Sequence, residues 1–136
     1  MTRYGRQLEH LDDVECVRLL EATHLGRVGL VQGCEPVIVP VNYVFHRNTV
    51  VFQTAMGSLL DPTPSFRGMA FEIDSSDPQF HSGWSVLVRG EARPVTDSRA
   101  ITRLQELPLR AWVPRESNRW VRLWPREITG RRISHL

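Results

Sequence analysis

The stretch EPVIVPVNYVFHRNTVVFQTAMGSLLD, residues 35–61, decides the fold that the sequence predicts. From Val37 to Phe45 the side chains alternate between two faces, which is the period of an extended strand. We expect this strand, 35–45, to be the longest in the chain and to be buried on both faces. Pro40 cannot donate to a β-ladder, so it indicates an edge position or a bulge. The turn at residues 46–48 then leads into a second apolar strand, 50–54, and the pair is typical of an antiparallel hairpin.

The second strand of this hairpin runs directly into a loop of small residues. Thr54 and Ser58 each carry a hydroxyl that can donate a hydrogen bond, and Gly57 lets backbone N–H groups approach a ligand closely. Such a loop is able to hold an anion such as a phosphate. The alternative is an ordinary turn, because Gly and Ser dominate turns for conformational reasons alone.

The rest of the chain is organised as short elements around the hairpin. Asp12 caps a helix that runs to about His24, and Asp97 caps a second helix that ends before Pro108. No element is expected over residues 1–10, which are polar and predicted to be mobile. The pattern adds four more strands, at residues 27–31, 69–74, 84–95 and 119–124, with polar loops between them. About six antiparallel strands and two helices at this spacing favour a closed barrel over a parallel sheet.

Length and composition limit the classes of function. The 136 residues fit one domain, and a formal net charge of +2 does not indicate a nucleic-acid or membrane surface. Cys16 and Cys34 lack metal-type spacing, and the five histidines are scattered, so no metal site is expected. Without a signal peptide or a long apolar run, the sequence predicts a soluble cytoplasmic protein. Every basic residue is Arg, so any phosphate would meet guanidinium groups.

Six short motifs occur in one order along the chain, and together they resemble the pyridoxamine 5′-phosphate oxidase-like family of FMN-binding split β-barrels, most closely its small actinobacterial branch. The resemblance covers nearly the whole chain. The motifs are Gly26-Arg27-Val28-Gly29, Pro40-Val41-Asn42-Tyr43, Val51-Phe52-Gln53-Thr54 with Gly57-Ser58, Phe71-Glu72-Ile73-Asp74, Gly83-Trp84-Ser85-Val86 and Thr129-Gly130-Arg131-Arg132.

The resemblance implies a mainly β antiparallel split barrel with two or more helices, spanning residues 1–136 as a single domain. It also implies a homodimer that binds FMN, or a deazaflavin coenzyme, in a cleft between the subunits. Val41 and Asn42 would line the flavin ring, while Thr54, Gly57 and Ser58 would reach its phosphate. Trp84 is a candidate to stack on the ring, although the four tryptophans are first expected in the core or at the subunit interface. One of the neighbouring pair Arg131 and Arg132, with Arg131 as our candidate, is expected at the interface or the cofactor.

One departure from the family pattern concerns the phosphate. Relatives commonly carry Arg before the threonine and Lys after the serine, whereas this chain has Gln53 and Leu59. Either another arginine supplies the charge, with Arg67 the nearest candidate in sequence, or the cofactor is different or absent. Three classes therefore stay open: a flavin-dependent oxidoreductase acting on a small-molecule substrate, a non-catalytic flavin- or ligand-binding dimer, and a structural dimer without cofactor. A deazaflavin-dependent reductase is a variant of the first class.

Overall fold

The computed structural model describes residues 6–63, 65–109 and 118–135, and over these ranges the chain is mainly β with two helices, as predicted. The elements in chain order are β1 Arg6–Leu11, α1 Asp13–Ala22, β2 Leu25–Gln32, β3 Glu35–Asn42, β4 Val44–His46, β5 Thr49–Ala55, β6 Phe66–Asp77, β7 Ser82–Pro94, α2 Ser98–Leu104 and β8 Asn118–His135.

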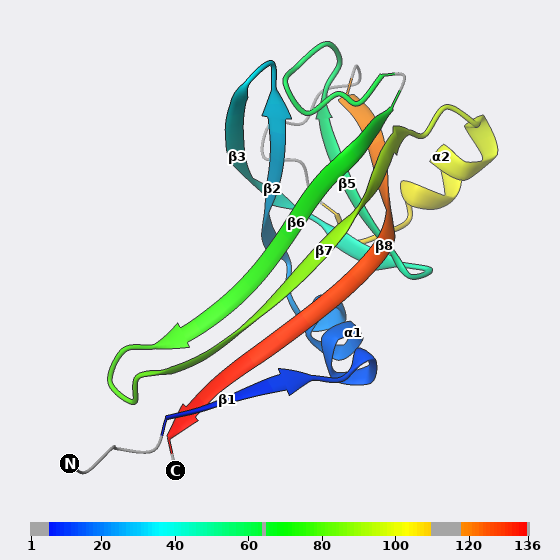
Figure 1. Ribbon diagram of the computed structural model, residues 1–136. Coiled ribbons are helices and arrows are strands. Elements are labelled where there is room, and N and C mark those ends of the chain that lie inside the picture. Colours follow the sequence, from blue (N-terminus) through cyan, green and yellow to red (C-terminus); the bar gives the residue numbers. More distant parts are fainter. Residues whose placement is uncertain (1–5, 64, 110–117, 136) are drawn as a thin grey trace.

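The strands form one antiparallel sheet of eight strands, in the order β3–β2–β6–β7–β8–β5–β4 with β1 paired to β8 beside this path. β8 has β7 along one side, and its other side is shared by two strands. β5 pairs with residues 118–123 and β1 pairs with residues 130–135. The sheet therefore curls at one end and continues at the other as the long strands β6, β7 and β8 (Figure 1). This half-barrel confirms the predicted split-barrel fold.

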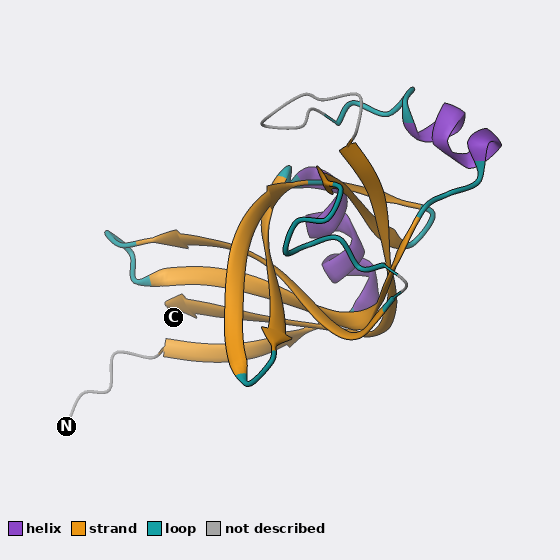
Figure 2. Ribbon diagram, turned by 90° about the horizontal axis from the view of Figure 1, so that it is seen from above, coloured by secondary structure: helices purple, strands orange, loops and turns teal. Residues whose placement is uncertain are grey.

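Helix α1 packs beneath the curled sheet and contributes to the main core. Asp12 caps it as predicted, since its side chain accepts a hydrogen bond from the backbone N–H of Glu15 at 2.8 Å. The predicted apolar stripe is confirmed in Cys16, Leu19 and Leu20, which are buried against the inward side chains of the strands. Seen from above, α1 lies within the ring of strands, whereas α2 lies outside it (Figure 2).

Helix α2 covers a second, smaller cluster on the outside of β5 and β8. Asp97 caps this helix as predicted by accepting from the N–H of Ala100 at 3.1 Å. Leu104 packs with Val51 and Trp120, so one predicted interface tryptophan belongs to the core of a single copy. Trp124 is half exposed, and Trp112 lies outside the described residues.

The predicted strand 35–45 is wrong in three respects. It is interrupted at Tyr43, whose hydroxyl donates to the Leu20 carbonyl at 2.7 Å and whose N–H donates to the His24 carbonyl at 3.0 Å. These bonds turn Tyr43 toward α1 and end β3. The outer face of β3 is open, since Ile38 is 71% exposed. The longest strand is β8, with 18 residues. The edge position inferred from Pro40 is confirmed, because β3 ends the sheet.

Other corrections extend strands into polar sequence. β1 occupies residues 6–11, where no element was expected before the first helix, and β6 and β7 extend through part of the predicted loop 75–83. β8 continues from residue 124 to 135. In each case the backbone pairs with a neighbouring strand, so polar side chains do not end the ladder. No helix among the described residues has the length and apolar character needed to cross a membrane.

Candidate functional site

The predicted glycine loop follows β5 at the curled end of the sheet. The hydroxyl oxygens of Thr54 and Ser58 lie 2.7 Å apart and share a hydrogen bond, and the Ser58 N–H donates to the Ala55 carbonyl at 3.1 Å. Gly57 has φ +74°, a left-handed conformation that favours glycine. The structure thus brings Thr54, Gly57 and Ser58 together in one turn. Sharing one bond still leaves one hydroxyl hydrogen of the pair available to a ligand.

Asp61 places a carboxylate inside this loop. Its Oδ2 accepts the Gly57 N–H at 2.8 Å, while its Oδ1 accepts the N–H and the hydroxyl of Thr63 at 3.2 and 2.6 Å. The side chain is only 6% exposed. Burial raises the pKa of Asp61, but the hydrogen bonds from Gly57 and Thr63 and the charge of Arg119 outweigh it and hold the pKa below its usual value. The carboxylate is therefore ionised at neutral pH.

Arg119 brings a positive charge to the same loop. It is the β8 partner of Thr54 in the β5–β8 ladder, and its Nε lies 3.5 Å from Asp61 Oδ2. Its side chain is 21% exposed, so it is neither fully buried nor freely solvated. Sequence reasoning did not identify Arg119 or Asp61 as site residues. Nothing local in the sequence indicates that residue 119 pairs with residue 54, because the pairing is set by the sheet order.

The two positions that depart from the family pattern have structural explanations. Gln53 pairs with Trp120, and successive strand residues face opposite sides, so Gln53 faces away from Thr54 toward the α2 side of β5. Leu59 packs against the main core, where its neighbour Leu60 is buried. Leu59 therefore fills space beneath the loop, which is the role of an apolar side chain rather than of a phosphate ligand.

Three other predicted contacts belong to β3 and to the start of β6. Arg67 is exposed at a bulge near the start of β6, where its carbonyl accepts a hydrogen bond from Arg126 at 3.3 Å. Val41 is buried in the core at the end of β3. Asn42 is half-buried beside it and pairs with Leu25 of β2.

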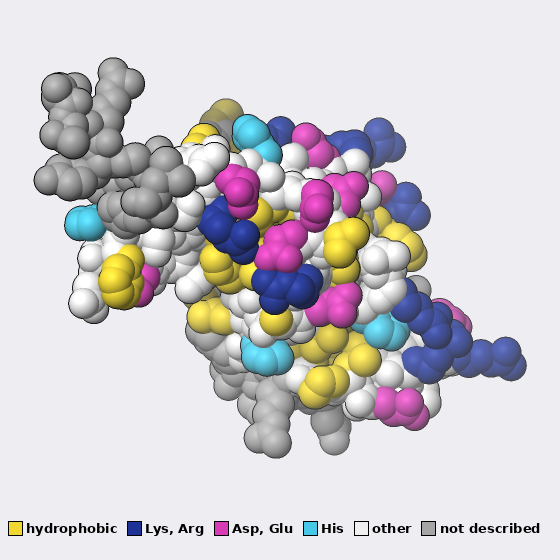
Figure 3. Space-filling view, turned by 90° about the horizontal axis from the view of Figure 1, so that it is seen from below, with side chains coloured by type: hydrophobic (Ala, Val, Ile, Leu, Met, Phe, Trp, Pro, Cys, Tyr) yellow, Lys and Arg dark blue, Asp and Glu magenta, His cyan; other side chains and the backbone are white. Residues whose placement is uncertain are grey.

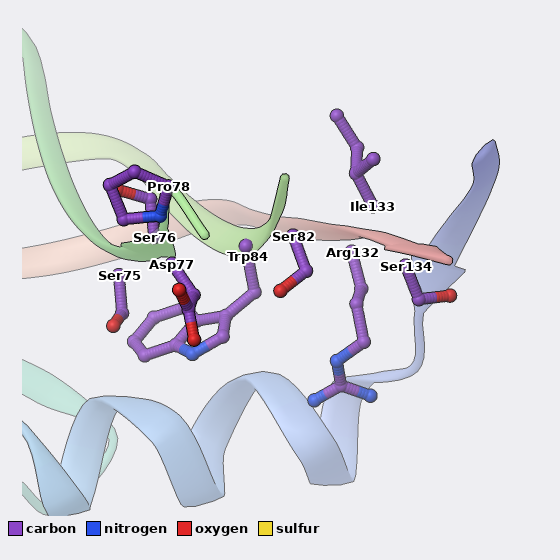
Figure 4. Close-up of a pocket in the computed structure, with 10 residues that line it drawn as sticks. Ser75, Ser76, Asp77, Pro78, Ser82, Trp84, Arg132, Ile133 and Ser134 are labelled. Carbon is purple, nitrogen blue, oxygen red and sulfur yellow. The ribbon is translucent and has the colours of Figure 1, made fainter. Parts of the chain in front are cut away.

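The remaining predicted contacts, Trp84 and Arg131, lie at the other end of β7 and β8 and on opposite faces of the sheet. Trp84 pairs with Arg132, whereas Arg131 pairs with Ser85. Trp84 and Arg132 both project toward α1, beside a cavity of about 520 Å³ (Figure 4). There the Arg132 guanidinium lies 3.0 Å from Glu15. Hydrogen bonds from Arg18 and Arg132 lower the pKa of Glu15 to about 2, so this pair ties β8 to α1.

Arg131 faces outward and lines a second cavity, of about 450 Å³, together with Glu72 and Ser85. Arg27 binds both Glu72, at 3.3 Å, and Asp74, at 2.9 Å, so two carboxylates share one guanidinium. Burial, followed by the hydrogen bond and the charge of Asp74, raises the pKa of Glu72 to about 7 despite Arg27. The charge of this cavity therefore changes near neutral pH.

These positions divide the predicted site into two groups. The loop group lies where β8 begins, and the group at Trp84 and Arg131 lies about a dozen residues further along, which is roughly 40 Å of extended strand. The loop and Arg131 therefore lie toward opposite ends of β8. At the loop, the free hydroxyl hydrogen of the Thr54–Ser58 pair and the Arg119 guanidinium form a donor set that fits a single phosphate group of a nucleotide cofactor.

Comparison with known proteins relates this geometry to a family. The family model described as pyridoxamine 5′-phosphate oxidase matches residues 12–132. The uncharacterized protein Rv0080 of Mycobacterium tuberculosis is 35% identical over 134 residues, covering 95% of this chain and 88% of its own length.

Solved structures agree with this match. An FAD-binding protein of Mycobacterium smegmatis is 37% identical, with a TM-score of 0.78 over 91% of this chain and 98% of its own. A candidate pyridoxamine 5′-phosphate oxidase of Corynebacterium glutamicum is 29% identical, with a TM-score of 0.80 over 100% of this chain and 98% of its own. The chain belongs to the pyridoxamine 5′-phosphate oxidase family.

Proposed function

We propose that the protein binds a flavin nucleotide in a cleft between two copies of the chain and acts as a flavin-dependent oxidoreductase. The observation that carries the proposal is the donor set at the glycine loop, where Thr54 and Ser58 share one turn and Arg119 is the partner of Thr54 on the neighbouring strand β8. Its family supports a flavin as the ligand, since the similar M. smegmatis protein is FAD-binding.

The second copy is inferred from the division of the site. Because Arg131 and the loop lie at opposite ends of β8, a flavin that contacts both needs the loop of one copy and Arg131 of the other. This arrangement also places the outward cavity beside Arg131 near the cleft, whereas Trp84, on the α1 side of the sheet, lies away from it. The proposal also includes a homodimer as the working form of the protein and the cytoplasm as its location.

The face that we assign to the second copy is the outer face of the sheet, opposite α1. It exposes Val31 and Ile38 on β2 and β3, and Leu8 and its partner Ile133 on β1 and β8. An apolar groove of about 340 Å³ runs past Val31 and Ile38 over the small residue Ala70. The groove is bordered by Arg89 and Arg126. The view from below shows the other side of the molecule, where α1 lies and where acidic and basic side chains stand among hydrophobic ones (Figure 3). Apolar surface with a charged rim is the usual composition of an interface.

The proposed activity depends on the flavin ring rather than on an acid or base of this chain. A bound flavin supplies the electron transfer, and the protein positions the ring and excludes water. In this role Thr54, Ser58 and Arg119 hold the phosphate end, and Asn42 lies at the end of β3 as a candidate contact for the ring. Glu72 is the one described carboxyl near the cleft whose pKa of about 7 allows it to hold a proton at neutral pH.

Identification of the bound cofactor tests the binding step. The purified protein is expected to be yellow and to release a flavin on denaturation, which chromatography then identifies as FMN, FAD or a deazaflavin. Titration of cofactor-free protein with FMN, FAD and riboflavin covers the case of a preparation that has lost its cofactor. If none of these binds at micromolar concentration, the proposal is wrong and the structural dimer without cofactor is the better account.

Turnover tests the second step. The flavin-loaded protein is mixed with a reduced nicotinamide in the absence of oxygen, and bleaching of the flavin absorbance is followed. Bleaching, and its reversal by an added electron acceptor, is the expected result for an oxidoreductase. A flavin that binds but is reduced no faster than free flavin indicates a binding protein without turnover.

A further inference from the structure

The Asp61 carboxylate occupies the backbone N–H of Gly57, which a glycine loop would otherwise offer to a bound anion. A glycine loop binds phosphate through N–H groups that point at the ligand. In this loop the Gly57 N–H is already occupied by Asp61 at 2.8 Å, and Thr63 supplies two more donors to the same carboxylate. The loop therefore contains its own anion.

The charge balance around this anion limits what the loop can bind. Arg119 is the one cationic group that lies within ion-pair distance of Asp61 among the described residues, and the two charges cancel formally. A phosphomonoester such as the end group of FMN carries about −1.5 to −2 at pH 7. A phosphodiester carries −1 on each phosphorus. The phosphomonoester therefore meets about twice the repulsion from Asp61 that one phosphodiester group meets, with no second cation among the described residues to offset it. In FAD the two charges are spread over the pyrophosphate, so only one of them needs to lie at the loop.

We propose that Asp61 sets the charge selectivity of the glycine loop, so that it prefers the singly charged phosphates of the FAD pyrophosphate over the phosphomonoester of FMN. The inference rests on the proposed function, because it requires a flavin phosphate at this loop. Gln53 and Leu59 agree with it, since Gln53 faces the other side of β5 and Leu59 packs on the core. Neither adds the positive charge that a phosphomonoester needs.

The experiment compares three ligands on three proteins. Riboflavin, FMN and FAD are titrated into cofactor-free parent, Asp61→Asn and Asp61→Glu, and flavin fluorescence reports binding. Riboflavin has no phosphate, so it measures the ring site alone. In the parent we expect FAD to bind more tightly than FMN. In Asp61→Asn we expect FMN affinity to rise about tenfold or more, because a unit charge near the phosphate has been removed. Riboflavin affinity is expected to stay within about twofold.

Asp61→Glu is the matched control, because it keeps the charge while changing the geometry. It is expected to keep the parent's preference for FAD. If both variants raise FMN affinity alike, the loop's shape rather than its charge is responsible and the inference is overturned. An unchanged ratio of FMN to riboflavin affinity in Asp61→Asn also overturns it. Failure of all three flavins to bind any of the proteins refutes the proposed function itself, which is a distinguishable result.

A second measurement needs no variant and therefore covers the case that Asp61→Asn fails to fold. The second ionisation of a phosphomonoester lies near pH 6, whereas the FAD diesters stay singly charged. Lowering the pH from about 7.5 to 5.5 should therefore raise the affinity of the parent for FMN relative to FAD by about threefold to tenfold. Riboflavin at the same pH values corrects for titration of the protein. A ratio that does not change with pH contradicts the inference.

Discussion

Two carboxylates of this molecule each lie beside an arginine, yet their pKa values shift in opposite directions. Asp61, in the glycine loop, receives three hydrogen bonds from Gly57 and Thr63 and has Arg119 to itself, and its pKa is lowered. Glu72, on the outer face, shares Arg27 with Asp74, and burial together with Asp74 raises its pKa to about 7. Burial raises the pKa of both groups; at Asp61 the bonds from Gly57 and Thr63 outweigh it, whereas at Glu72 the neighbouring Asp74 adds to it.

The comparison separates two kinds of functional surface. The loop end has a carboxylate that is ionised at neutral pH and still offers a hydroxyl hydrogen of the Thr54–Ser58 pair, which suits a site that holds the phosphate of a cofactor. The outer face combines exposed apolar side chains with a carboxyl that titrates near neutral pH, which suits a surface completed by a second copy. Each prediction below changes one of these regions and leaves the other intact.

The largest effect is expected from a charge on the outer face. Ile38→Arg places an unpaired guanidinium in the apolar groove, and twofold symmetry doubles it in the dimer. We expect the dimer to weaken about a hundredfold or more. Light scattering at micromolar concentration should show the parent near twice 15.6 kDa and the variant near 15.6 kDa. Val14→Arg, at an exposed position of α1, is the control and should stay dimeric. A parent mass near 15.6 kDa refutes the dimer.

The next effect concerns the cation of the loop. Arg119→Gln removes the one charged donor that the described residues place there, and hydrogen bonds to charged groups contribute about 1.5–3 kcal/mol. FMN and FAD should therefore bind roughly tenfold to a hundredfold more weakly, with riboflavin unchanged. Arg67→Gln is the matched control, because Arg67 is exposed at the β6 bulge. If Arg67→Gln shows the larger loss, the arginine identified by sequence reasoning is the phosphate contact after all.

A third prediction tests the two departures from the family pattern separately. Leu59→Lys takes an apolar side chain out of the core and is expected to cost about 1–3 kcal/mol of unfolding free energy. Gln53→Arg changes a side chain on the opposite face of β5 from Thr54. It should leave FMN affinity unchanged and should change the free energy of unfolding by no more than about 0.5 kcal/mol. Denaturant titration and FMN titration of each variant measure this. A gain of FMN affinity in Gln53→Arg would falsify the inference, drawn from the β5–β8 pairing, that Gln53 faces away from Thr54.

The sequence predicts the fold well because its evidence is local. Alternation in residues 35–54, the caps Asp12 and Asp97, and the stripe of Cys16, Leu19 and Leu20 each depend on neighbours within a few positions. What it misses depends on pairing between distant segments. β1, the extension of β8 and the break at Tyr43 are all set by backbone partners far along the chain.

The candidate site shows the same contrast between local sequence evidence and pairing of distant segments. Thr54, Gly57 and Ser58 lie within one turn, so their convergence could be predicted. Arg119 could not be found, because its place beside Thr54 results from the order β8–β5 in the sheet. Trp84 was correctly placed on a strand, whereas Arg131 lies beyond the predicted end of the last strand at residue 124. Their opposite faces and their distance from the loop emerge only from the register.

A smaller effect is expected from the loop hydroxyls. Ser58→Ala removes the partner of the Thr54 hydroxyl and one candidate donor to the phosphate. A net hydrogen bond contributes about 0.5–1.5 kcal/mol, so FMN or FAD affinity should fall roughly twofold to tenfold. Thr49→Ser, which keeps its hydroxyl at the far end of β5, is a suitable control. If Ser58→Ala and the parent bind FMN and FAD equally tightly relative to riboflavin, Ser58 does not contact the phosphate.

The smallest effect concerns the titrating carboxyl of the outer face. The pKa of Glu72 is about 7 in the folded chain and near 4.3 in an unfolded one, so the folded state binds the extra proton between these values. The free energy of unfolding contributed by Glu72 therefore falls as pH rises from about 4.5 through 7. The side chain is 35% exposed and solvent screens it, so we expect a loss of no more than about 1 kcal/mol.

Glu72→Gln should remove this dependence, so that its free energy of unfolding falls less than the parent's between pH 5 and pH 8. Asp61→Asn gives the opposite case. Because the pKa of Asp61 is lowered, its stabilisation is present above the unfolded pKa and is lost as pH falls, so the variant should lose stability most at neutral pH. Denaturant titrations at pH 5, 6.5 and 8 measure both. If the free energy of unfolding changes with pH in the same way in the parent and in Glu72→Gln, the shared Arg27 guanidinium keeps Glu72 ionised. The two carboxylates would then differ in their place in the fold but not in their charge.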